Sequence, residues 1–179
     1  MFDHLLIARK LPIKEAEPFA TLYREHMAAV FNYCLFRVGD RTIAEDLTAD
    51  TFERAWRARR RYRPERAAFN TWLFTIARRV VTDWQRRQVR RRWVGLSDDQ
   101  SDGGPSPEAQ IEETEQQAEL RRLVQTLEPS EQELIALKFG AGMTNRDIAP
   151  VLGKSETAIG SAIYRIMQKL RAQWNNAHE

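Results

Sequence analysis

The sequence predicts an all-α fold, with two small helical domains joined by a flexible acidic linker and a helix-turn-helix in the C-terminal domain. Apolar residues recur at three- and four-residue spacing towards both ends of the 179-residue chain. No segment alternates convincingly in the manner of a β-strand. Residues 96–120 hold eight Asp and Glu and neither Lys nor Arg. We therefore expect domains at 15–94 and 116–175, with the linker at 95–115.

The N-terminal domain is expected to contain three amphipathic helices. Gly39 and Asp40 end the first helix and begin the second, and a loop starting at Tyr62 leads to the third. The three apolar stripes are Phe19, Leu22, Tyr23, His26, Val30 and Tyr33; Ile43, Leu47, Phe52, Ala55 and Trp56; and Leu73, Ile76, Ala77, Val80 and Trp84. Each stripe predicts one buried helix face.

The linker is recognised by its composition. Gly103, Gly104, Pro105 and Pro107 oppose a continuous helix or strand, and few of the neighbouring residues are apolar. The acids at 98, 99 and 102 lack the remaining ligands of a calcium loop, so no metal site is expected there. Solvated linker is the better interpretation.

The charge distribution predicts a polyanionic partner. Residues 1–95 carry 20 Lys and Arg against 11 Asp and Glu, and the densest part, 57–92, has 13 arginines against Glu65 and Asp83. Arginine bonds two phosphate oxygens at once and also stacks on bases. A solvated surface usually interleaves both signs of charge, so nucleic acid is the favoured partner.

The third helix and the loop before it are the first candidate nucleic-acid site. Turned at 100° per residue, an aromatic side chain and several arginines share one helix face, which suits a single strand because bases stack on the ring while guanidinium groups hold the backbone. The alternative is that Phe69 and Trp72 only complete the core. The candidate residues are Arg63, Phe69, Asn70, Trp72, Arg79, Asp83, Arg86, Arg87 and Arg90.

The second candidate site is a helix-turn-helix at residues 144–165. Thr144 and Ser155 are placed to cap two helices, and Gly153 permits the tight turn between them. In this motif the second helix enters the major groove of duplex DNA; a helical hairpin without DNA is the alternative. Pro150 is expected to interrupt the first helix. The candidate residues are Thr144, Ser155, Glu156, Thr157, Gly160, Ser161, Tyr164, Arg165 and Lys169.

Four segments, in order, resemble bacterial RNA polymerase sigma factors of the extracytoplasmic-function (ECF) type of the sigma-70 family. They are FATLYREHMAAVFNYCLFRVGD, RTIAEDLTADTFERAWRA, FNTWLFTIARRVVTDWQRR and the region from LEPSEQELIALKFG to IYRIMQKLR. The run AEDLTxxTFxRAW is specific. The resemblance covers nearly all of the chain after about residue 17.

The resemblance implies a protein that binds core RNA polymerase and directs promoter-specific transcription initiation. It assigns polymerase binding to the second helix, capture of an unpaired minus-ten base to the third helix and its loop, and readout of the minus-thirty-five element to the helix-turn-helix. It also implies an anti-sigma factor. The implied polymerase-binding residues are Asp46, Leu47, Asp50, Thr51 and Glu53.

The sequence also departs from the family pattern. Arg79 stands where the family often has Asn, and Gly160 and Ala162 occupy positions that are often basic. A promoter sequence therefore does not carry over to this chain. A stand-alone helix-turn-helix regulator is the alternative function, and it would bind promoter duplex tightly without polymerase. An adaptor that binds only protein would leave the arginine face unexplained.

Enzymatic activity and cofactors are not expected. The histidines at 4, 26 and 178 are scattered, and no phosphate loop or nucleophile elbow is present. Cys34 has no partner for an intramolecular disulfide. No apolar run approaches the roughly 20 residues that a bilayer requires, and the N-terminal charges have the wrong order for a secretory signal, so we expect no membrane insertion and a cytoplasmic location.

Overall fold

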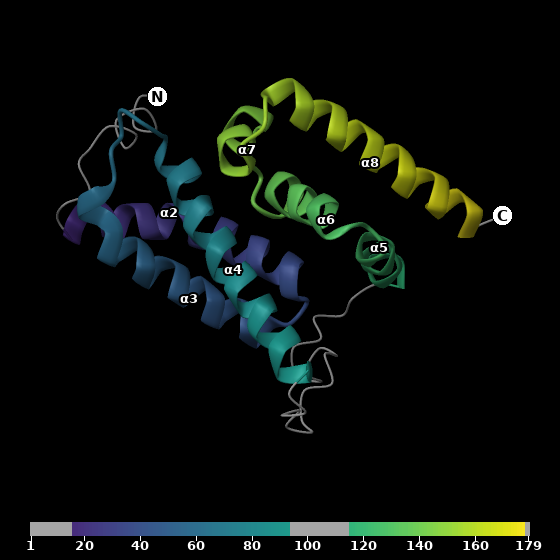
Figure 1. Cartoon of the computed structure of the whole chain (residues 1–179), viewed down its shortest axis with the longest axis horizontal. Helices are drawn as coiled ribbons and strands as arrows, with labels where there is room; N and C mark the ends of the chain where they lie inside the picture. The colour runs from purple at the N-terminus through teal and green to yellow at the C-terminus, as the bar shows by residue number, and fades with distance from the viewer. Residues whose placement is uncertain (1–15, 94–114, 178–179) are drawn as a thin grey trace. The chain divides into compact units, whose positions relative to one another are not determined.

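The computed structural model describes residues 16–93 and 115–177, which form two compact units (Figure 1). All of the regular structure in these two ranges is helical, which confirms the predicted all-α class. The units divide between Gly104 and Pro105. The expected linker at 95–115, apart from its last residue, and residues 1–15 lie outside the described residues, and the exact domain limits stay predictions.

The first unit is a three-helix arrangement. Helix α2 spans Ala16–Val38, α3 spans Arg41–Ala58 and continues into the short 3₁₀ turn η1 (Arg59–Arg61), and α4 spans Phe69–Trp93. Gly39, with a φ of 73°, ends α2, because a residue with a side chain rarely adopts this conformation. Asp40 caps α3 by accepting a 2.8 Å hydrogen bond from the backbone N–H of Ile43.

The core of the first unit lies where α2, α3 and α4 meet (Figure 1). Tyr33 and Phe74 are fully buried and pack edge to face, with ring centroids 5.7 Å apart. Helix α3 contacts both α2 and α4 through one broad face, and at 100° per residue its buried residues span about 140° of the helix surface. Its buried residues are Ala44, Leu47, Thr48, Thr51, Phe52 and Ala55.

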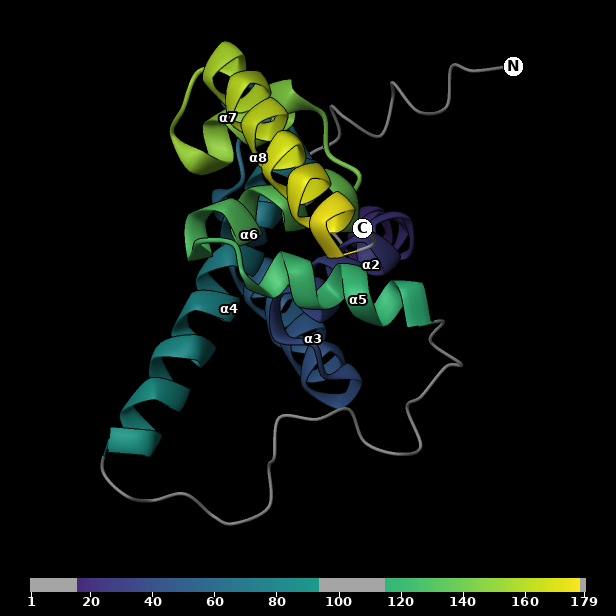
Figure 2. The ribbon, with the colours of Figure 1, turned by 90° about the vertical axis from the view of Figure 1, so that its right-hand side faces the viewer.

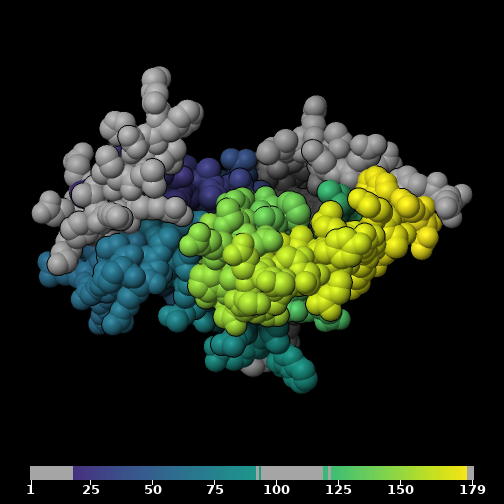
Figure 3. All heavy atoms as spheres, turned by 90° about the horizontal axis from the view of Figure 1, so that it is seen from above, coloured from purple at the N-terminus to yellow at the C-terminus, as the bar shows by residue number. Residues whose placement is uncertain are grey.

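Within residues 115–177, the second unit contains four α-helices and one π turn. Helix α5 spans Glu115–Gln125, α6 spans Pro129–Ile135, the π turn η3 spans Ala136–Gly140, α7 spans Asn145–Leu152 and α8 spans Glu156–Ala177. Helix α8 contacts α5, α6 and α7. Its buried residues, Ile159, Ile166 and Leu170, lie on one face, which leaves the other side of the helix uncovered along its length (Figure 3).

No helix within residues 16–93 or 115–177 has both the length and the apolar character needed to cross a bilayer.

Candidate polymerase and promoter interface

An acidic stripe lies on the outer face of α3. Asp46, Asp50 and Glu53 follow one another at i, i+4 and i+7, so they share one side of the helix. Asp46 and Glu53 are exposed and Asp50 is half-buried. We call these three residues the acidic stripe; Asp50 and Glu53 form ion pairs with Arg54 and Arg57 of the same helix.

Two other residues predicted for this surface, Leu47 and Thr51, lie in the core, and their contact with polymerase stays a prediction. Leu47 and Thr51 are buried, and the Thr51 hydroxyl donates a 2.7 Å hydrogen bond to the Leu47 carbonyl one turn earlier. Around the helix they lie about 60° and 100° from Asp50, the nearest member of the acidic stripe, on a side that α2 and α4 cover. Their side chains hold α3 in the core of the first unit.

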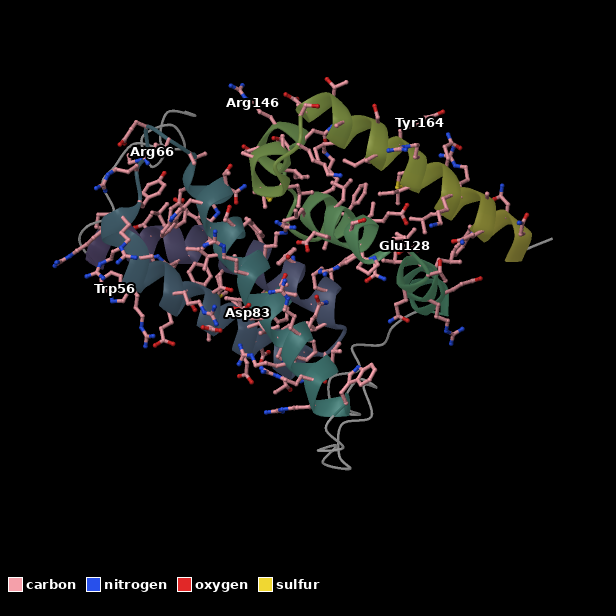
Figure 4. The ribbon with its side chains drawn as sticks, in the orientation of Figure 1. Trp56, Arg66, Asp83, Glu128, Arg146 and Tyr164 are labelled. Carbon is pink, nitrogen blue, oxygen red and sulfur yellow. The ribbon has the colours of Figure 1, made fainter. Side chains whose placement is uncertain are left out.

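Arg54 joins the acidic stripe to α4. Its Nε and Nη2 each bond an oxygen of Asp50 at 2.8 Å, and its Nη1 bonds Asp83 Oδ2 at 3.2 Å. The hydrogen bond to Asp50 is the main cause of a raised pKa for Arg54, and Asp83 adds to it. Asp83 is the single acid of α4 and lies midway along it (Figure 4). Arg54 therefore offsets the one negative charge on the arginine-rich helix.

The start of α4 carries an aromatic cluster made of Tyr62, Phe69 and Trp72. Ring centroids are 5.8 Å apart between Tyr62 and Phe69, 5.0 Å between Tyr62 and Trp72, and 5.5 Å between Phe69 and Trp72. The Tyr62 hydroxyl donates to the carbonyl of Ala67 at 3.1 Å, which closes the loop over the cluster. The three rings therefore form one rigid group.

The cluster changes the predicted roles of its members. Phe69 is only 3% exposed and packs against His26, with ring centroids 5.2 Å apart, which favours the alternative that it completes the core; a contact of Phe69 with DNA stays a prediction. Trp72 and Asn70 are half-buried and keep part of their surface accessible. Sequence reasoning did not single out Tyr62 as a partner for them; its position at the start of the loop before α4 was the available signal.

Burial has also shifted the pKa of His26. Desolvation lowers the pKa of this imidazole from its usual value, and Glu25 opposes the shift only in part. Neutral His26 is thus the form that fits against Phe69.

The arginine face of α4 continues beyond the aromatic cluster. All four of its predicted residues have exposed side chains, and Arg87 Nε lies 3.3 Å from the backbone carbonyl of Asp83. Arg63, in the loop before the helix, is also exposed and donates to the carbonyls of Arg60 and Tyr62. The four residues are Arg79, Arg86, Arg87 and Arg90.

The helix-turn-helix forms with the caps that the sequence predicts. The Thr144 hydroxyl accepts from the backbone N–H of Asp147 at 3.2 Å, and the Ser155 hydroxyl accepts from that of Ala158 at 3.2 Å. Gly153 has a φ of 65° and makes the turn between α7 and α8. Thr144 and Ser155 thus have a structural role that explains their presence, and DNA contact by them stays a prediction.

The expectation that Pro150 interrupts the first helix of this motif is wrong. Helix α7 runs through Pro150 to Leu152. Pro150 and Arg146, whose carbonyl loses its helical hydrogen bond to the proline, are both exposed. A carbonyl without a helical partner costs little where water can reach it.

The outer face of α8 is polar and carries little charge. Glu156, Thr157, Ser161 and Tyr164 are exposed, Tyr164 by 66%, and Figure 4 shows Tyr164 pointing away from the helix core. Gly160 is half-buried, since a Cβ atom there would lie 3.5 Å from Asn145 Nδ2 of α7. It therefore lies beside α7 and not on the fully open face.

The two basic residues predicted to contact phosphates differ in their surroundings. Arg165 is exposed. Lys169 Nζ lies 3.0 Å from Glu131 Oε2 of α6, and this bond is the main cause of a lowered pKa for Glu131. Lys169 therefore links α8 to α6 through an ion pair, and its contact with a phosphate stays a prediction.

Two basic residues of the motif were missed by sequence reasoning. Arg146, in the first turn of α7, and Lys154, between α7 and α8, are both exposed. Figure 4 shows Arg146 projecting outward from α7. Their positions within the predicted motif at residues 144–165 were the signal that could have identified them.

No group of three or more His, Cys, Asp or Glu suited to hold a metal ion occurs in residues 16–93 and 115–177. Cys34 is fully buried, and burial raises the pKa of its thiol to about 12 although a hydrogen bond with Thr48 lowers it.

Comparison with known proteins gives two family matches in chain order. Sigma-70 region 2 matches residues 22–91, and Sigma-70 region 4 matches residues 117–170. The chain is 34% identical to the ECF RNA polymerase sigma factor SigL of Mycobacterium tuberculosis over 166 residues, which cover 88% of this chain and 89% of SigL. It belongs to the ECF sigma factors of the sigma-70 family.

Other relatives agree with this membership. The ECF sigma factor BldN of Streptomyces coelicolor is 35% identical over 158 residues, covering 87% of this chain and 60% of BldN. The RNA polymerase sigma factor YlaC of Bacillus subtilis is 25% identical over 170 residues, covering 93% of this chain and 98% of YlaC. The chain thus spans somewhat less than two thirds of BldN but nearly all of YlaC.

Two solved structures share the fold. CnrH, in complex with the cytosolic domain of CnrY, superposes with a TM-score of 0.69 at 23% identity, covering 96% of each chain. RpoE of Bartonella quintana, in complex with the anti-sigma factor NepR, superposes with a TM-score of 0.65 at 20% identity, covering 89% of this chain and 98% of RpoE. The ECF sigma factors are transcription initiation factors, and this chain is one of them.

Proposed function

We propose that this chain binds core RNA polymerase through α3, captures the opened minus-ten strand with α4 and its loop, and reads the minus-thirty-five duplex with α7 and α8. The observation that carries the proposal is the match to regions 2 and 4, in order, on a chain whose consecutive helices present an acidic stripe and then an arginine face. In this account the chain acts in the cytoplasm, catalyses no reaction itself and needs no cofactor.

The polymerase contact is assigned to the acidic stripe. Asp46, Asp50 and Glu53 would meet basic side chains of the polymerase, an arrangement that steers association and fixes register. Leu47 and Thr51 would support the stripe from inside the first unit.

The minus-ten contact is assigned to the accessible parts of the aromatic cluster and to the arginine face. Trp72 would offer the accessible part of its indole ring for stacking and Asn70 an amide able to bond a base edge, while the exposed Arg79, Arg86 and Arg90 would bind phosphates. Phe69 and Tyr62 would hold Trp72 in position rather than touch DNA.

The minus-thirty-five contact is assigned to the uncovered face of α8. Glu156, Thr157, Ser161 and Tyr164 would approach base edges, with Arg165 and Arg146 near phosphates. This face suits an intact major groove, which accommodates a whole α-helix.

An inhibitory partner is also part of the proposal. The structures of CnrH and of RpoE described above were determined with the cytosolic domain of CnrY and with the anti-sigma factor NepR, respectively. By analogy we infer that an anti-sigma factor binds this chain when it is not engaged with polymerase.

The test is run-off transcription with core polymerase, combined with copurification. Asp46→Arg and Glu53→Arg should reduce copurification with core and lower the transcript yield, because each reverses a charge in the acidic stripe. Glu45→Arg is the matched control: it makes the same charge change on the same helix, but Glu45 lies off the stripe and pairs with Arg41 at 3.0 Å.

Two results would contradict the proposal. If both stripe variants copurify as well as the Glu45 control, α3 does not bind polymerase. If the free chain binds one promoter duplex tightly and specifically and core polymerase adds no defined start site, the stand-alone regulator is the better description.

A further inference from the structure

The C-terminal turns of α4 leave the core of the first unit. Val81 is the last buried residue of α4 among the side chains that the structure describes. The Arg37–Gln85 hydrogen bond, at 3.2 Å, joins this helix to α2 one turn further on. Figure 2 shows the end of α4 running clear of α2 and α3.

Two apolar side chains are exposed on this projecting segment. Val89 is 56% exposed, and Trp93 is 86% exposed, the most exposed of the large hydrophobic residues in the described ranges. At 100° per residue, Arg86, Arg90 and Trp93 fall within about 60° of one another on the helix surface. An indole ring therefore continues the arginine face. Among the described side chains of residues 82–93, none is buried.

The positive charge of this C-terminal segment of α4 indicates a negatively charged partner. Residues 82–93 carry five arginines and one acid, Asp83, which Arg54 already engages. Cations near a helix C-terminus interact favourably with its dipole, but arginines at i and i+4, such as Arg86 and Arg90, repel each other. The helix dipole explains why some positive charge is tolerated at this end of α4. It does not explain why the indole of Trp93 is exposed beside that charge. A polyanion with flat apolar rings offers both the missing counter-charge and a surface for the indole.

We propose that Trp93, with Arg86 and Arg90, forms a second contact with unpaired nucleic acid: the indole stacks on one base of the opened promoter strand, and the two guanidinium groups hold neighbouring phosphates. Trp93 is 21 residues from Trp72, about 30 Å along the helix, so one base cannot touch both. The inference rests on the proposed function, because it takes the opened promoter strand as its ligand.

The test compares holoenzyme binding to two templates, a forked promoter with an exposed single strand and the same promoter as closed duplex. Trp93→Ala should weaken binding to the forked template by about 5- to 140-fold, the equivalent of one lost base stack. Trp93→Tyr should restore most of the affinity, because it keeps a stacking ring. Binding to the closed duplex should change little.

Val89→Ala is the matched control, since it removes an exposed apolar side chain from the same turns of α4 but no ring. Thermal unfolding of each variant shows whether folding has changed, and the exposure of Trp93 predicts that it has not. A photoreactive benzoylphenylalanine in place of Trp93 should crosslink to the opened strand in the holoenzyme–promoter complex.

Parent-like binding of Trp93→Ala to the forked template would overturn the inference, as would an equal loss on both templates or a crosslink to protein alone. These outcomes are separate from failure of the proposed function, which would appear as the absence of a defined transcript from the parent holoenzyme. In that case both proposals fall.

Discussion

Helices α4 and α8 are both assigned to DNA, yet they differ in how much positive charge they carry. Helix α4 carries seven arginines against one acid, and that acid is engaged by Arg54. Helix α8 carries Arg165, Lys169 and Arg171 against Glu156, and Lys169 is engaged by Glu131. The difference indicates that α4 gains binding energy from phosphates and stacked bases, whereas α8 gains selectivity from small polar side chains at base edges.

The largest expected effect is a loss of folding stability that is confined to the first unit. Phe74→Ala removes a fully buried ring that packs on Tyr33, so the free energy of unfolding of the first unit should fall by about 3–5 kcal/mol. Four of the five tryptophans lie in the first unit, so tryptophan fluorescence during denaturation reports mainly on it.

Hydrogen exchange in α7 and α8 provides the control for Phe74→Ala. Protection there should stay unchanged, because the second unit has its own core around Ile148 and Ile159. Equal loss of protection in both units would mean that α4 and α8 cannot be compared as parts of separate domains.

The next effect concerns base selectivity in α8. Glu156 is exposed in the first turn of the helix, where its carboxylate can accept from a cytosine amino group. Glu156→Ala should cost about 1–3 kcal/mol at one base pair of the minus-thirty-five element and relax selectivity at that position. Binding of holoenzyme to a set of single-base variants measures this. An equal loss of affinity for every promoter variant would show that Glu156 does not read a base.

A smaller change should make α8 more like α4. Gly160→Lys adds a cation beside the outer face, and a Cβ at this position meets Asn145 only at ordinary contact distance, so the fold should accept it. General affinity for duplex should rise, and the salt dependence should steepen by roughly 0.9 in log–log slope, as expected for one added phosphate contact. A salt series with holoenzyme measures the slope; an unchanged slope would place residue 160 away from the phosphates.

The smallest expected effect is a pH dependence confined to the first unit. The pKa of His26 is lowered in the folded state, so the unfolded chain binds more protons below about pH 6.5, the usual histidine value. Stability should therefore fall as the pH drops through the window below 6.5. His26→Gln should lessen this fall, as seen in thermal unfolding between pH 7 and pH 5. An identical pH profile in the variant would mean that other groups cause the dependence.

The local parts of this structure could be predicted from sequence, because their causes are local. Asp40, Thr144 and Ser155 cap their helices, and Gly39 and Gly153 take the positive φ angles that the expected turns require. These features depend on residues within one helical turn of each other, and the printed sequence contains all that is needed to infer them.

Which side chains are buried was less predictable, because burial depends on contacts between segments that are distant in the sequence. Thr51 is buried because the side of α3 that carries it packs against α2 and α4, and Phe69 is buried under Tyr62 and beside His26. The hydrogen bond from Arg54 to Asp83 joins residues 29 positions apart. An apolar stripe predicts that one helix face is buried but not which other helices cover it.

The most direct test of the contrast between α4 and α8 is permanganate footprinting of holoenzyme–promoter complexes formed by Trp72→Ala, with Trp72→Phe as the control that keeps a ring against Tyr62. Trp72→Ala should lower thymine reactivity in the minus-ten region by about 5- to 140-fold, while protection of the minus-thirty-five duplex stays at the parent level. Trp72→Phe should retain most of the opening. Unchanged thymine reactivity together with a lowered melting temperature would contradict the account, because it would make Trp72 a core residue and leave α4 without its aromatic contact to the opened strand at the minus-ten element.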